Sequence, residues 1–134
     1  MKNIKIAVAD DHKYLRVHVS EILTSLGYSV ILQAANGEEL IDGITELKVL
    51  PDLCIIDINM PIMDGFRTTR EVKKRWPAIK ILAYSITTEK RIIDEILHSG
   101  ADDFINKDID PKILNLTIKN LFNPKLQKAT NNPV

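Results

Sequence analysis

Short apolar runs alternate along this chain with longer stretches in which apolar residues recur every three or four positions. The short runs are typical of strands that are buried on both faces of a sheet, and the periodic stretches are typical of helices with one apolar face. The runs predict strands over residues 4–9, 30–34, 53–56, 79–83 and 104–105. The periodic stretches predict helices over residues 12–26, 36–50, 64–76, 87–99 and 110–122.

Polar residues mark the start of four of these helices. Asn36-Gly37 opens the second helix, and Asp64 and Asp110 can each accept a hydrogen bond from an amide of the first turn of the third and fifth helices. Thr87 or Thr88 is expected to do the same for the fourth helix. The apolar side chains predicted to face the core are Ile92, Ile93, Ile96 and Leu97 on the fourth helix, and Ile113, Leu114, Ile118, Leu121 and Phe122 on the fifth.

Five strands that alternate with five helices over short connections predict an α/β domain with a parallel sheet and right-handed crossovers. Such a sheet is doubly wound, with helices on both faces. We therefore expect a flavodoxin-like (βα)5 fold, with a five-stranded parallel sheet in the order 2-1-3-4-5. Residues 1–122 form this domain, and the polar segment 123–134 is expected to be a tail or a truncated linker.

The charge balance and the single cysteine narrow the class of protein. The 18 basic and 18 acidic residues leave no net charge, so the chain lacks the electrostatic footprint expected for direct binding to nucleic acid or an anionic membrane. Cys54 lies inside an apolar run and is expected to be a buried thiol, which suits a reducing cytoplasm. No apolar stretch is typical of a signal peptide or a membrane span, so we expect a cytoplasmic protein.

Polar side chains follow four of the predicted strands. Asp10 and Asp11 follow the first strand, Asp57 and Asn59 the third, Ser85 and Thr87 the fourth, and Lys107 the fifth. Because these four strands are neighbours in the order 2-1-3-4-5, their carboxyl ends should bring the side chains together at one edge of the sheet. Asp57 should lie where its strand emerges, since an ionised carboxylate is costly to bury in a core.

The combination of these residues indicates a chemistry that none of them indicates alone. Three carboxylates held close together repel one another and raise at least one pKa, unless a hard cation shares the site. Mg²⁺, or Mn²⁺ in its place, prefers such oxygen ligands. A magnesium site beside an ammonium and a hydroxyl is typical of phosphoryl transfer, and an aspartate can itself accept a phosphoryl group.

With these residues in place, the chain resembles the receiver domain of two-component response regulators over residues 3 to about 122. The matching pieces are Asp10-Asp11, the stretch from Asp57 to Gly65, Ser85, Gly100-Ala101-Asp102 and Lys107. The resemblance implies that Asp57 takes a phosphoryl group from a sensor histidine kinase, a phosphotransfer protein or a small donor such as acetyl phosphate. It also implies that Mg²⁺ is held by Asp10, Asp11, Asp57 and the backbone carbonyl of Asn59.

The resemblance implies a switch as well as a phosphoacceptor. Ser85 and Lys107 would contact the phosphoryl oxygens, and Phe104 matches the family's aromatic switch position. If Ser85 shifts inward it vacates room for Phe104, which would carry the signal to the face formed by the last two helices and the strand between them. This face could then pair with a second copy on activation. Such a domain stores a signal and is not a turnover enzyme.

Three features of the sequence distinguish it from the commonest receiver pattern. Asp10-Asp11-His12 with Arg16, and Lys107-Asp108, look most similar to receivers that precede a helix-turn-helix DNA-binding domain, so the output would be transcription if such a domain follows. Asp108 stands where many receivers have proline. Ile86 is larger than the residue that usually follows the hydroxyl, and with Thr87 it is expected to limit access to the site and slow the loss of the phosphoryl group.

Two other functions use the same features less well. A haloacid-dehalogenase-like phosphatase would use Asp57 as a turnover nucleophile with Mg²⁺, but it needs a second acid two residues later, where this chain has Asn59. It also needs a cap domain or a larger domain, for which 134 residues leave little room. A flavin- or nucleotide-binding module would need glycines or hydroxyls after the first strand, whereas Asp10-Asp11 would repel a phosphate.

Overall fold

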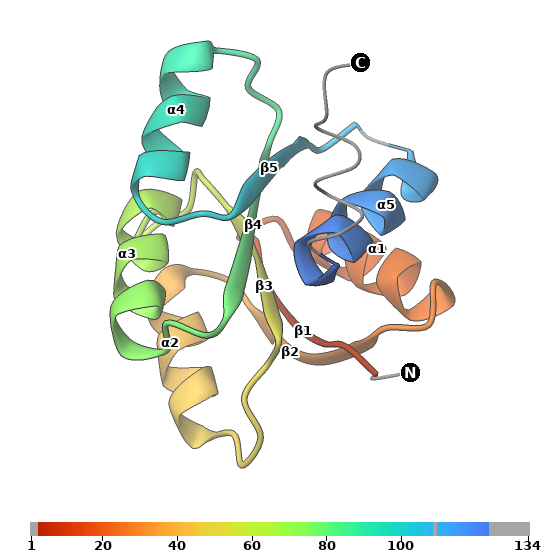
Figure 1. Ribbon diagram of the computed structural model, residues 1–134. Coiled ribbons are helices and arrows are strands. Elements are labelled where there is room, and N and C mark those ends of the chain that lie inside the picture. The colour runs from red at the N-terminus through yellow and green to blue at the C-terminus, as the bar shows by residue number, and fades with distance from the viewer. Residues whose placement is uncertain (1–2, 109, 124–134) are drawn as a thin grey trace.

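The computed structural model describes residues 3–108 and 110–123, along which strands and helices alternate as predicted (Figure 1). The strands are β1 (Lys5–Ala9), β2 (Ser29–Ala34), β3 (Leu53–Asp57), β4 (Lys80–Ser85) and β5 (Asp103–Asn106). The helices are α1 (Lys13–Ser25), α2 (Gly37–Glu46), α3 (Gly65–Arg75), α4 (Lys90–His98) and α5 (Pro111–Phe122). The predicted tail lies outside the described residues from 124 onward.

The strands form one parallel sheet in the order β2-β1-β3-β4-β5, which confirms the flavodoxin-like prediction. Helices α1 and α5 cover one face of the sheet, and α2, α3 and α4 cover the other (Figure 1). An apolar cluster lies under each helical layer, and β3 contributes alternate side chains to both clusters. The central strands are therefore buried on both faces, which is why their sequences are continuous apolar runs.

Most of the predicted helix starts are confirmed, whereas α2 ends at Glu46 and not at residue 50, because the backbone is already extended at Leu47. The side chains of Asn36, Asp64 and Asp110 accept hydrogen bonds from amides in the first turns of α2, α3 and α5. The prediction for α4 is wrong: its N-cap is Glu89, which makes no side-chain capping bond within the described residues. Thr87 lies before the helix, where its hydroxyl oxygen accepts a hydrogen bond from the Glu89 amide at 3.2 Å.

Two apolar residues predicted to face the core are exposed instead. Leu97 is on the outer side of α4, and Ile113 is on the outer side of α5. Their helices bury narrower stripes than the sequence suggested: α4 buries Ile96 fully, and α5 buries Leu114, Ile118 and Leu121. Both helices are therefore only partly embedded, and each presents apolar side chains on its outer surface.

Gly65 allows α3 to begin directly against the end of β3. Its amide donates a hydrogen bond to the Ile58 carbonyl at 2.8 Å. A Cβ atom at this position would lie 2.4 Å from the carbonyl oxygen of Asp57 and 2.6 Å from the Cα of Ile58. Because backbone atoms cannot move aside cheaply, only glycine fits here, and this close approach constrains the backbone that follows Asp57.

No helix among the described residues is long and apolar enough to cross a membrane.

Candidate phosphoacceptor site

The predicted carboxylates converge at the carboxyl edge of the sheet. Asp10 and Asp11 follow β1, Asp57 ends β3, and carboxylate oxygens of the three residues lie within 4.8 Å of one another. Asp10 and Asp57 are buried, whereas Asp11 is exposed. This spacing and the all-oxygen donor set fit a hard cation such as Mg²⁺, which accepts one or two carboxylates and keeps several waters.

Lys107 links the two buried carboxylates. Its Nζ lies 3.2 Å from Asp10 Oδ2 and 3.3 Å from Asp57 Oδ1. The lysine reaches them from the loop after β5, where its amide donates a hydrogen bond to the Ser85 carbonyl at 3.0 Å and so continues the pairing with β4. One ammonium therefore compensates two acids that would otherwise repel each other in a poorly solvated place.

Asp57 lies at the predicted edge of the sheet but is only 4% exposed. Burial raises its pKa from the ordinary value of 3.8 to about 6, with Lys107 opposing the change and the charge of Asp10 adding to it. The amide of Asn59 donates to Asp57 Oδ1 at 3.4 Å, a long hydrogen bond. Asp57 is therefore ionised at neutral pH, although its buried position disfavours the negative charge.

Asp10 is fully buried and is held by more partners than the sequence suggested. The amide of His12 donates to its Oδ1 at 2.9 Å, and the phenolic hydroxyl of Tyr84 donates to its Oδ2. Arg16, on α1, donates to the backbone carbonyl of Asp10 at 2.7 Å. Burial, followed by the interaction with Asp10, raises the pKa of Tyr84 above its ordinary value, so the phenol keeps its proton and remains a donor.

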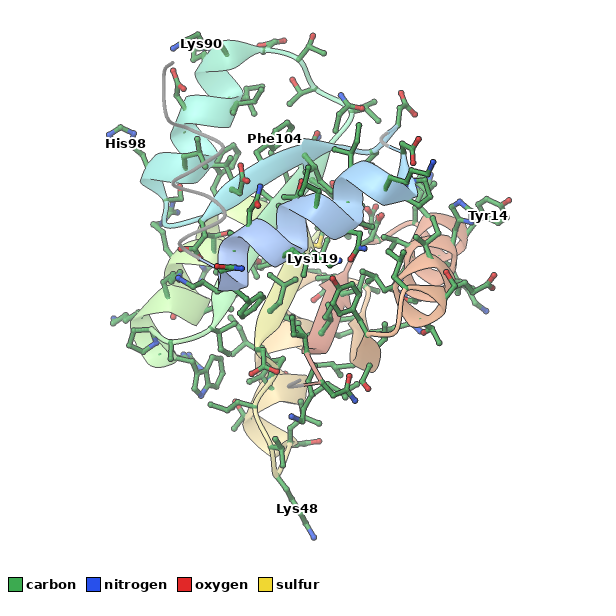
Figure 2. All side chains as sticks on the ribbon, turned by 45° about the vertical axis from the view of Figure 1, so that its right-hand side comes forward. Tyr14, Lys48, Lys90, His98, Phe104 and Lys119 are labelled. Carbon is green, nitrogen blue, oxygen red and sulfur yellow. The ribbon has the colours of Figure 1, made fainter. Side chains whose placement is uncertain are left out.

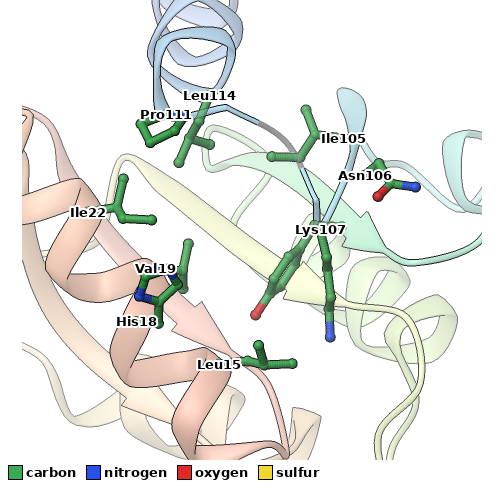
Figure 3. A pocket seen from close by; sticks show the side chains of 10 residues that line it. Leu15, His18, Val19, Ile22, Ile105, Asn106, Lys107, Pro111 and Leu114 are labelled. Carbon is green, nitrogen blue, oxygen red and sulfur yellow. The ribbon is translucent and has the colours of Figure 1, made fainter.

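Tyr84 was not among the predicted site residues. It lies in β4 directly before Ser85 and pairs with Asp57 in the sheet register. Lys107 Nζ lies over its ring, 4.8 Å from the ring centroid. Tyr84 also lines a small cleft between α1 and α5, and Figure 3 shows Leu15 and His18 of α1 on one side of this cleft and Leu114 of α5 on another, with Lys107 nearby. The sequence offered one signal for Tyr84, which is that a tyrosine on a buried strand needs a hydrogen-bond partner for its hydroxyl.

The predicted switch and access residues lie near the acidic cluster, at different distances from it. Ser85 is buried at the end of β4, and its Oγ accepts a hydrogen bond from the Thr87 amide at 3.2 Å. Phe104 is half-buried on β5 next to α4 (Figure 2). Ile86 is 72% exposed and lines a groove beside the site together with Asn59 and Thr87. The site therefore opens to solvent past a large apolar side chain.

Comparison with known proteins decides the family. The model of the response regulator receiver domain matches residues 6–119. This chain belongs to that family. It is 35% identical to the chemotaxis protein CheY of Thermotoga maritima over 80% of this chain and 88% of that protein. It is 31% identical to the transcriptional regulatory protein DegU of Brevibacillus brevis over 87% of this chain and 49% of DegU, so it spans about half of that relative.

Solved structures agree with the fold of this receiver domain. A CheY-like response regulator receiver domain protein from Methanospirillum hungatei matches with a TM-score of 0.80 and 26% identity, covering 96% of this chain and 99% of that one. The acidic pocket of this receiver domain is formed by Asp10, Asp11 and Asp57, the cluster in which receiver domains bind Mg²⁺.

Proposed function

We propose that this receiver domain is a phosphorylation-activated switch in which Asp57 is the phosphoacceptor. The observation that carries this proposal is the placement of one buried carboxylate at a strand end with an ammonium 3.3 Å from its Oδ1 and two further acids beside it. The donor is a phosphohistidine of a sensor kinase or of a phosphotransfer protein. Small acyl phosphates provide a second source.

The transfer requires little of the protein beyond positioning and charge compensation. An Asp57 carboxylate oxygen attacks phosphorus, a P–O bond forms, and the P–N bond to the donor imidazole breaks, so that the leaving nitrogen keeps the electron pair. Lys107 is placed to follow the negative charge from the carboxylate to the phosphoryl oxygens, and Ser85 offers a hydroxyl. Mg²⁺ held by the three acids and the Asn59 carbonyl would neutralise charge on the carboxylates and on the transferred group.

The signal leaves the site through β4 and β5. Phosphorylation adds about 1.5–2 negative charges and three acceptor oxygens, which attract the Ser85 hydroxyl and the Lys107 ammonium. Both residues belong to one backbone connection, because the Lys107 amide donates to the Ser85 carbonyl. An inward shift of Ser85 gives Phe104 room to turn inward and alters the face formed by α4, β5 and α5.

The central test is the intact mass of the protein after incubation with Mg²⁺ and acetyl phosphate or a phosphorylated histidine kinase. Wild type should gain one phosphoryl group, and Asp57→Asn should gain none. Asp64→Asn is the matched control, because it makes the same change in an exposed aspartate that caps α3. Wild-type protein that gains no phosphate from either donor would refute the proposal.

The same experiment separates a switch from a haloacid-dehalogenase-like phosphatase. A switch accumulates one phosphoryl group per chain and consumes donor only as fast as that group is lost. A phosphatase turns over a small phosphomonoester without accumulating the intermediate. The chain has Asn59 where such an enzyme requires an acid, which favours storage over turnover.

The output is proposed from similarity and from the exposed face. DegU is a transcriptional regulatory protein of which this chain matches about half, so we propose transcription control where a DNA-binding domain follows the receiver domain at 1–122, with 123–134 as the linker. The exposed Leu97 and Ile113 on α4 and α5 suit pairing with a second copy on activation. Sedimentation with and without beryllium fluoride, a phosphoryl mimic, tests the pairing, and a monomer in both conditions would contradict it.

A further inference from the structure

Asp10 is a fully buried carboxylate that accepts three hydrogen bonds from the described residues. Its Oδ2 takes both the hydroxyl of Tyr84 and the ammonium of Lys107, the latter at 3.2 Å, and its Oδ1 takes the His12 amide at 2.9 Å. An ionised carboxylate offers about four acceptor positions. The two on Oδ2 are therefore filled, and one position on Oδ1 remains for a cation or its water.

The three donors differ in what happens to them during phosphorylation. The His12 amide belongs to the backbone and stays in place. Lys107 lies 3.3 Å from Asp57 Oδ1 and is the residue that must follow charge onto the phosphoryl group. When it turns toward that group, Asp10 Oδ2 loses its ammonium, and a buried carboxylate oxygen without a partner is costly. Tyr84 is then the side-chain donor that remains on Oδ2.

We propose that Tyr84 is a positioning residue that keeps Asp10 satisfied while Lys107 transfers to the phosphoryl group. The inference rests on the proposed function and names a residue that stabilises the phosphorylated state of the same site. Tyr84 acts through Asp10 and does not touch the phosphoryl group. It also fixes which carboxylate oxygen of Asp10 stays open on the metal side, since it occupies Oδ2 in both states.

The surroundings of Tyr84 hold its hydroxyl in this place. The residue is 4% exposed, and its backbone is fixed between β3 and β5, paired with Asp57 on one side and Ile105 on the other. Its ring packs in the apolar cluster beneath α1 and α5. Lys107 Nζ lies over the face of the ring, 4.8 Å from its centroid, and the ammonium and the hydroxyl make separate hydrogen bonds to Asp10 Oδ2.

The test compares two binding steps in Tyr84→Phe, which removes one oxygen and keeps the ring. Mg²⁺ binding alone leaves Lys107 on Asp10, so its dissociation constant should stay within about threefold of wild type. Beryllium fluoride binding at saturating Mg²⁺ draws Lys107 away, so it should weaken about tenfold or more, the effect of losing a hydrogen bond to a charged group. Calorimetry measures the first step and fluorine NMR of bound fluoride measures the second.

Tyr28→Phe is the matched control. It removes the same atom from a tyrosine whose hydroxyl donates to Asn115 Oδ1, far from the phosphoacceptor site, and both binding steps should match wild type. Beryllium fluoride binding by Tyr84→Phe equal to wild type would overturn the inference. Parallel weakening of both steps would also overturn it, because that pattern indicates a distorted site and not loss of a donor needed in one state.

Wild-type protein provides a second measurement if Tyr84→Phe does not fold. A buried phenol donating to a carboxylate exchanges slowly, and its hydroxyl proton is expected as a downfield resonance in proton NMR. The resonance should persist when Mg²⁺ and beryllium fluoride are added, and its loss on addition would refute the inference. Wild type that takes neither a phosphoryl group nor beryllium fluoride would overturn the proposed function and this inference together, whereas equal binding by the variant overturns the inference alone.

Discussion

Replacing Asp57 by asparagine should make the metal-free protein more stable at neutral pH. The fold raises the pKa of this carboxyl from 3.8 to about 6, chiefly by burial. Each pKa unit is worth about 1.4 kcal/mol, so ionised Asp57 lowers the free energy of unfolding by about 3 kcal/mol. Because the folded-state pKa is the higher one, its favourable contribution is complete below about pH 4 and is lost as the pH rises through about 6. Asparagine carries no charge at any of these pH values.

Urea unfolding in EDTA between pH 4.5 and pH 8 measures this effect. Asp57→Asn should gain up to about 3 kcal/mol over wild type at pH 7.5, and the gain should shrink toward pH 4.5. Asp42→Asn makes the same chemical change on an exposed part of α2 and should show no such trend. A gain that is absent, or that is constant across this pH range, would show that burial of the Asp57 charge is not a source of instability.

Three further substitutions test the backbone and the access to the site. Gly65→Ala places a Cβ 2.4 Å from the Asp57 carbonyl oxygen and should lower the free energy of unfolding by about 3 kcal/mol in urea, with a loss of phosphorylation; unchanged stability would contradict the close approach. Ile62 is 72% exposed and has a φ of 71°, so Ile62→Asn should raise stability by about 1 kcal/mol, and a loss of stability would refute the strain argument. Ile86→Ala should speed loss of the phosphoryl group, followed by mass spectrometry, and an unchanged rate would show that Ile86 does not limit access.

The fold was predictable because its signals are local and repeated. Each buried strand is a continuous apolar run, and Asn36, Asp64 and Asp110 mark helix starts by a hydrogen bond that spans two or three residues. The right-handed crossovers then place helices on both faces of a parallel sheet, and the flavodoxin-like pattern supplies the strand order. The start of α4 was mispredicted because Thr87 makes a local turn with Glu89 in place of a cap, and a threonine favours both arrangements.

The clustering of the acids and the lysine was predictable, but the electrostatics of the site and the role of Tyr84 were not. The acids after β1 and β3 and the lysine after β5 were expected to lie close together once the sheet order was known, and they do. The depth of Asp57 could not be inferred, because a charge at the end of an apolar run is expected at the surface. Gly65 lets α3 begin against the end of β3, but the sequence does not show how deeply this arrangement buries the Asp57 side chain.

Tyr84 shows why a motif alone gives an incomplete account of such a site. On a buried strand an aromatic residue is expected to pack, and its ring does so. Its hydroxyl becomes meaningful only when the sheet register places Tyr84 beside Asp57 and brings its hydroxyl to Asp10, which lies 74 positions earlier in the chain. Two buried acids with one ammonium between them would leave a deficit of positive charge whenever Lys107 moves. The Tyr84 hydroxyl is a neutral donor that stays on Asp10 and does not compete for the phosphoryl group. It therefore lowers the free-energy cost of moving the Lys107 ammonium from Asp10 to the phosphoryl group.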